Sequence, residues 1–71
     1  MKITSQQAEK LLKGNQSFGQ LGFSMLLMRL KMVYANDPSP ATLQHCTGEI
    51  NVFLGKFTSL MSKDYETITK M

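Results

Sequence analysis

Apolar residues recur at intervals of three and four along most of this chain, which is the spacing of one face of a helix. The pattern predicts helices over 5–13, 18–35 and 39–61, and a short helix, or a continuation of the third, over 64–70. We therefore expect an all-α protein with one helical domain over 1–71. Its architecture is expected to be an antiparallel helical hairpin with a short N-terminal helix and a C-terminal cap, three to four helices in all.

Capping residues support these boundaries. Thr4 and Gln7 form a capping-box pattern ahead of the first helix, and Ser17 and Gln20 repeat it ahead of the second. Pro38 ends the second helix, because the residue before a proline avoids helical geometry.

The helix predicted over 39–61 has a single apolar face. Its apolar residues are spaced 3, 4, 3, 4 and 3 apart, at Leu43, Cys46, Ile50, Phe53, Phe57 and Leu60. The rest of its circumference is mostly polar or small, including Gly48 and Gly55, which either admit another backbone or are simply tolerated. A helix with one apolar face is expected on the outside of the bundle.

The helix predicted over 18–35 is apolar on two opposite sides. One side carries a methionine-rich stripe of Phe18, Leu21, Met25, Met28, Met32 and Ala35. The other carries a band of Phe23, Leu26, Leu27, Leu30, Val33 and Tyr34. A helix of this kind should be buried on both faces. We expect the methionine-rich stripe to pack against 39–61, although such stripes also serve as adaptable binding grooves.

The second band is the predicted partner-binding face. Only the short helix over 5–13 and the C-terminal segment are left to cover it. A helix of about 18 residues is roughly 27 Å long and one of about nine residues roughly 13 Å, so part of the band is expected to lack a partner within the chain. Aromatic residues and arginine are enriched at interfaces. The predicted contact residues are Phe23, Leu27, Leu30 and Tyr34, flanked by Arg29 and Lys31. Coverage of this face by 5–13 alone is the alternative.

The small size of the chain favours self-association. Chains of roughly 70–80 residues or fewer usually need disulfides, a metal or a partner for stability. One cysteine forms no internal disulfide, and no Cys/His set has metal-ligand spacing. We therefore expect a homodimer in which two helical hairpins complete a four-helix bundle.

Nucleic-acid binding is the alternative function, because the net charge is +3. Lys10, Lys13, Arg29 and Lys31 could form a phosphate-contacting surface. The segment 18–27, which would be the recognition helix of a helix-turn-helix, is too apolar to read bases. A small basic nucleic-acid-binding protein or transcription regulator therefore ranks below a protein-binding module.

Catalysis, metal binding and cofactor binding have no support in the sequence. Cys46 lies within the apolar stripe of 39–61, which predicts a buried and inert thiol. His45 is its neighbour but points about 100° away on a helix, so the two form no dyad. No paired carboxylates, phosphate loop or nucleophile motif is present. We expect no catalytic residues, no metal and no cofactor.

The expected compartment is the cytoplasm. Arg29 and Lys31 interrupt the apolar run that precedes them, which argues against a signal peptide, and no run is long enough to span a membrane. A single cysteine fits a reducing compartment. The predicted function is a non-catalytic protein-binding role, as a small regulator, inhibitor, adaptor or chaperone that acts through helix–helix contacts.

Overall fold

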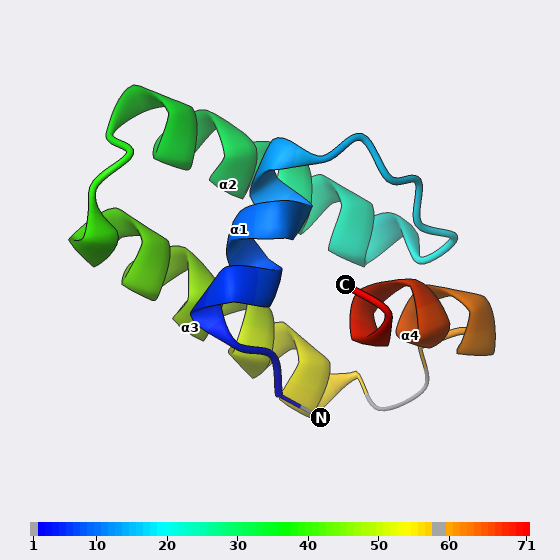
Figure 1. Cartoon of the computed structure of the whole chain (residues 1–71). Helices are drawn as coiled ribbons and strands as arrows, with labels where there is room; N and C mark the ends of the chain where they lie inside the picture. The colour runs from blue at the N-terminus through cyan, green and yellow to red at the C-terminus, as the bar shows by residue number, and fades with distance from the viewer. Residues whose placement is uncertain (1, 58–59) are drawn as a thin grey trace.

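The structure is a computed structural model that describes residues 2–57 and 60–71. Within these residues the regular structure is entirely helical, which confirms the all-α prediction. The chain runs through α1 (Ser5–Lys13), α2 (Leu21–Asn36), α3 (Pro40–Lys56) and α4 (Ser62–Thr69), as Figure 1 shows.

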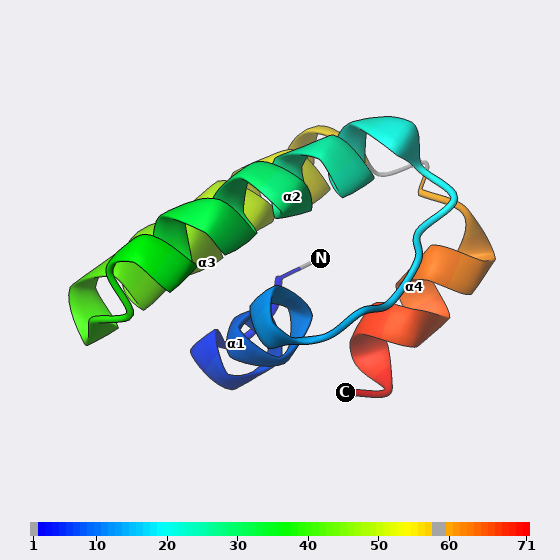
Figure 2. The same cartoon turned by 90° about the horizontal axis from the view of Figure 1, so that it is seen from above.

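The helices form two layers. Helices α2 and α3 lie side by side and antiparallel, so the predicted hairpin is present (Figure 1). Helix α1 crosses the hairpin and contacts both of its helices. Viewed from above, α1 and α4 both lie on the same side of the hairpin, and no described helix covers the opposite side (Figure 2).

Local capping explains where α1 and α3 begin. The Thr4 hydroxyl accepts a hydrogen bond from the Gln7 amide at 3.2 Å, and the Gln7 side chain accepts one from the Thr4 amide at 2.9 Å. The predicted capping box is therefore confirmed. At the start of α3, the Ser39 hydroxyl accepts from the Thr42 amide, and Pro40 occupies the first helical position, where no amide hydrogen is needed.

The boundaries of the other segments differ from the prediction. Helix α2 begins at Leu21 rather than at 18, because Gln20 is the cap and its side chain accepts from the Gly22 amide at 2.9 Å. Ser17 does not cap this helix. Helix α3 ends at Lys56, well before the predicted 61, and part of that predicted extension lies outside the described residues. Helix α4 begins at Ser62, slightly before the predicted start.

All four helices contribute to one core. Its buried apolar residues are Ile3, Ala8, Leu11, Leu12, Phe23, Leu27, Leu30, Tyr34, Cys46, Ile50, Leu54 and Ile68. Phe18, Phe23 and Phe53 add aromatic contacts, with ring centroids 5.0 Å apart for the first two and 5.4 Å apart for the last two. The apolar face predicted for 39–61 is buried at Cys46 and Ile50, as expected.

The two apolar faces of α2 are used in the opposite way to the prediction. Phe23, Leu27, Leu30 and Tyr34, the expected partner-binding residues, are between 0% and 9% exposed. The residues expected to pack against α3 are instead open, with Leu21, Met25, Met28 and Met32 between 62% and 74% exposed.

The path of α1 gives the physical reason. If each face of α2 needed a separate partner helix, α1 would be too short to cover one of them. Helix α1 instead crosses the hairpin, so α1 and α3 together bury one face of α2. Ala8 and Leu11 of α1 are fully or almost fully buried in this shared core.

Candidate protein-binding surface

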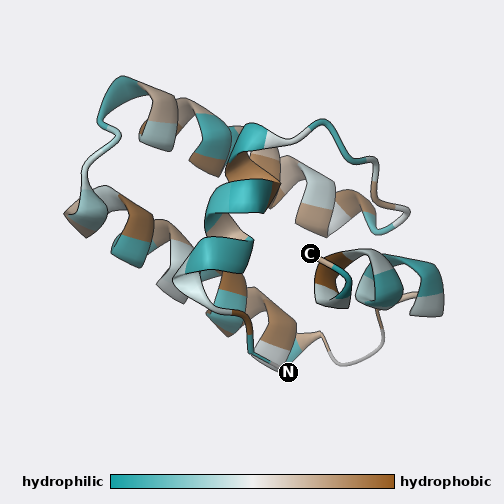
Figure 3. Cartoon of the chain, viewed as in Figure 1, coloured by the Kyte–Doolittle hydropathy of each residue, from teal (hydrophilic) through white to brown (hydrophobic). Residues whose placement is uncertain are grey.

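An exposed apolar stripe follows the outer side of α2. We call Leu21, Met25, Met28 and Met32 the methionine stripe; all four side chains are exposed. Their spacing of 4, 3 and 4 places them on one face of the helix. The eleven residue steps from Leu21 to Met32 span about 17 Å. This face points away from the shared core. The ribbon in Figure 3 is coloured by residue hydropathy, and hydrophobic positions recur along both α2 and α3.

A groove between α2 and α3 adjoins the stripe. It has a volume of about 480 Å³ and is lined by Gly22, Met25, Leu26, Arg29 and Phe53. Met25 belongs to both the groove and the stripe. Gly22 contributes no side chain to this wall, and a Cβ atom there would make ordinary van der Waals contact with the Phe53 ring at 3.5 Å. The groove therefore offers apolar space beside the exposed Arg29 guanidinium.

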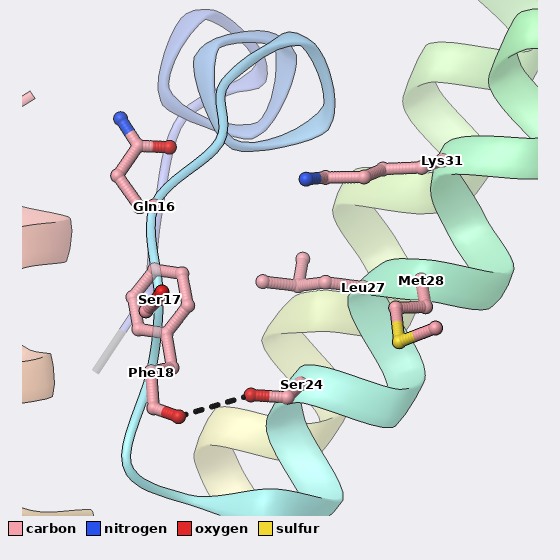
Figure 4. Close-up of a pocket in the computed structure, with 7 residues that line it drawn as sticks. All are labelled: Gln16, Ser17, Phe18, Ser24, Leu27, Met28 and Lys31. Atoms are coloured by element: carbon pink, nitrogen blue, oxygen red, sulfur yellow. Dashed lines mark hydrogen bonds between the residues drawn. The ribbon is translucent and has the colours of Figure 1, made fainter.

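A second hollow lies along the other flank of α2 (Figure 4). It has a volume of about 270 Å³, and its lining residues are Gln16, Ser17, Phe18, Ser24, Leu27, Met28 and Lys31. The Ser24 hydroxyl donates to the Phe18 carbonyl oxygen at 3.1 Å, which ties α2 to the segment before it. Met28 links this hollow to the methionine stripe, so the exposed surface extends beyond a single row of side chains.

Cations flank the stripe, and α2 contains no acidic residue. Arg29 follows Met28 on one side of the helix, and Lys31 precedes Met32 on the other, because neighbouring residues point about 100° apart. Arg29 is exposed, while the Lys31 ammonium donates to the Gly14 carbonyl oxygen at 2.7 Å. The charge along this surface is therefore positive.

The other predicted basic residues, Lys10 and Lys13, lie on α1 in the opposite layer. The Lys10 ammonium donates to the Met71 carbonyl oxygen at 3.1 Å. Lys13 pairs with Glu9 at 3.4 Å, as the spacing of these residues predicts. The structure therefore does not bring Lys10 and Lys13 together with Arg29 into one basic patch.

The two residues considered for reactive chemistry, Cys46 and His45, are neighbours on α3. Cys46 is fully buried, and burial first and the nearby Glu49 second raise the pKa of its thiol, which lowers the population of the reactive thiolate. His45 is exposed beside it. No cluster of three or more His, Cys, Asp or Glu residues in 2–57 and 60–71 could hold a metal ion.

Two sets of hydrogen bonds, which we call clamps, join a side chain to backbone groups far away in the sequence. The sequence patterns do not predict them. Asp64 of α4 is only 2% exposed, and its two carboxylate oxygens accept from the Gly19 and Gln20 amides, each at 2.9 Å. Asn51 of α3 accepts from the Ile3 amide at 2.8 Å and donates to the Ile3 carbonyl at 3.2 Å. Asp64 therefore fixes the backbone ahead of the methionine stripe.

No family model, curated protein or solved structure matches this chain. Among the described residues, no helix is both long and apolar enough to cross a membrane.

Proposed function

We propose that this chain is a non-catalytic protein-binding module that acts through helix–helix contacts and uses the methionine stripe as its contact surface. The observation that carries the proposal is the exposure of Leu21, Met25, Met28 and Met32, on the face of α2 opposite its buried residues. Contiguous exposed apolar surface of this kind marks interaction sites. Methionine side chains are flexible and polarisable, so they adapt to the shape of a partner.

The stripe is large enough for a specific but moderate interaction. Full burial of a Leu or Met side chain contributes about 1.5–3 kcal/mol, and burial of the exposed part of these four would contribute roughly 4–8 kcal/mol. Association itself has an entropic cost, which the two adjoining hollows must help to offset. A dissociation constant near 1 µM corresponds to about 8 kcal/mol. Because the stripe alone reaches this value only before the cost of association is subtracted, we expect binding that is micromolar or weaker, which suits a small regulator, inhibitor, adaptor or chaperone of the cytoplasm.

Self-association is a second candidate, favoured by the uncovered side of the hairpin. Two copies could pair their hairpins into the four-helix bundle that the sequence predicts. Such a homodimer would have to use the methionine stripe, because the face first expected to dimerise is buried in the core. Its opposing α2 helices would also bring the cations of the two copies close together.

Nucleic-acid binding ranks below both. Lys10 and Lys13 each have a hydrogen-bond or ion-pair partner within the chain, and they lie on α1, in the opposite layer from Arg29 and Lys31 of α2. A phosphate-binding function predicts affinity that falls steeply as salt rises. An absence of any mobility shift with duplex or single-stranded DNA and RNA at about 50 mM salt would remove this alternative.

The proposal is tested by site-specific photo-crosslinking in the source cells. A photoreactive residue at Met28 is expected to trap a discrete protein, whereas the same residue at Tyr65 of α4, on the other layer, is expected not to. The trapped protein is then purified and titrated with wild type and with the Met28→Glu variant. We expect at least tenfold weaker binding of the variant with unchanged helical content. Equal binding of the two forms would refute the stripe as the contact surface.

A further inference from the structure

We infer that the methionine stripe receives an acidic amphipathic helix from another protein. This inference rests on the proposed function and adds the chemistry of the partner.

The shape of the surface fits a helix laid along α2. The stripe spans about 17 Å, which is about three helical turns. A partner helix with apolar residues at positions i, i+4, i+7 and i+11 would present a matching row. The groove beside Met25 supplies a place for one larger side chain, because Phe53 forms part of its wall and Gly22 contributes no side chain to it.

The positive charge on the two flanks of the stripe favours an acidic partner helix. Arg29 and Lys31 lie on the two flanks of the stripe, and α2 has no acid to neutralise them. The facing helix α3 carries Glu49 and Lys56, whose charges cancel. A carboxylate on the partner would meet the Arg29 guanidinium beside the groove, where a planar guanidinium can bind it with two hydrogen bonds. Charge complementarity of this kind determines partner choice more than it determines affinity.

The same charges disfavour a second copy of this chain. In an antiparallel pair of α2 helices, each stripe would be flanked by the partner's cations as well as its own. Like charges placed opposite each other across an interface oppose association. A helix with glutamates in the flanking positions meets the stripe without this repulsion.

The experiment compares two designed peptides of about 20 residues, long enough to be helical in isolation. Both carry leucine at the four anchor positions; one has glutamate and the other lysine at the flanking positions. Binding to the full chain is measured by fluorescence anisotropy at about 50 mM salt. We expect the acidic peptide to bind at least tenfold more tightly. Arg29→Glu is expected to reverse or abolish this preference, and the exposed Tyr65→Glu variant to leave it unchanged.

The possible results separate the inference from the proposed function. If both peptides bind equally and Met28→Glu weakens both, the charge argument is wrong but the stripe is still a protein-binding surface. If neither peptide binds, the inference is wrong, and the photo-crosslinking experiment decides the proposed function independently. If sedimentation shows a dimer that Met28→Glu dissociates, a second copy occupies the stripe and the inference is also overturned.

Discussion

Replacing Asp64 tests how much one buried carboxylate contributes to the stability of this small chain. Its carboxylate is buried and accepts hydrogen bonds from the Gly19 and Gln20 amides. Asp64→Ala removes both bonds. Hydrogen bonds to a charged group each contribute about 1.5–3 kcal/mol, so the pair contributes roughly 3–6 kcal/mol. Because Gly19 is itself exposed and water can replace part of this interaction, we expect a loss of about 2–4 kcal/mol.

This loss is large for a chain of 71 residues. Domains of this size are stable by roughly 4–11 kcal/mol in total. A loss of about 2 kcal/mol or more should lower Tm by at least about 8 °C. Thermal unfolding followed by circular dichroism measures this change. Glu66→Ala is the matched control, because it removes an exposed carboxylate from the same helix.

Amide hydrogen exchange distinguishes loss of the Asp64 hydrogen bonds to the Gly19 and Gln20 amides from a general destabilisation of helix α4. Asp64 also lies in the first turn of that helix, where a negative charge is favourable in its own right. Loss of that effect would not alter the Gly19 and Gln20 amides, whereas loss of the clamp should speed their exchange. Unchanged exchange at both amides, or a Tm within about 2 °C of the Glu66→Ala value, would refute the reasoning.

Three further predictions concern the core. Leu30→Asp should unfold the chain, because Leu30 is 2% exposed and an unpaired charge there is strongly unfavourable; a far-ultraviolet spectrum with native helical content would contradict this. Cys46 should resist alkylation at pH 8 until urea is added, since burial raises the pKa of its thiol; equal rates with and without urea would count against it. The hydrogen bond to Glu9 raises the pKa of Tyr34, so protonated Tyr34 stabilises the fold below about pH 10, and this contribution is lost as pH rises through the folded-state pKa. Tyr34→Phe should therefore make unfolding less sensitive to alkaline pH, and an unchanged pH profile in urea titrations would reject the assignment.

Local patterns predict the helices of this chain well. The limits of α1 follow from residues within a few positions of each end, since Thr4 and Gln7 cap its start. Pro40 marks the start of α3 for the same local reason. The start of α2 is harder, because the capping-box pattern of Ser17 and Gln20 places the cap at Ser17, whereas Gln20 caps the helix.

The choice between the two faces of α2 could not be made from periodicity. Both faces are apolar at helical spacing, and hydrophobicity alone gives no preference between them. Side-chain type is a better guide: the buried face carries Phe23, Leu27, Leu30 and Tyr34, which fill a core with few rotamers, whereas the exposed face carries flexible methionines. The angle at which α1 crosses the hairpin determines which face of α2 is covered. That angle depends on contacts between residues that are far apart in the sequence.

The sequence does not predict the clamps, because they join residues that are far apart along the chain. Asp64 and Gly19 are separated by 45 positions, and Asn51 and Ile3 by 48. Nothing in the surroundings of an aspartate or asparagine along the chain indicates which distant amide it binds. Sequence patterns therefore predict the methionines of the stripe but place them against α3, and they do not indicate the residues that hold this surface in position.

The exposure of three methionines also makes this surface chemically vulnerable. Met25, Met28 and Met32 are each more than 60% exposed, so peroxide can reach their sulfur atoms without unfolding the protein. Oxidation to the sulfoxide turns an apolar side chain into a polar one. Mild peroxide should therefore weaken partner binding while helical content persists, and methionine sulfoxide reductases should restore it. Samples stored in air are expected to lose binding before they lose their fold.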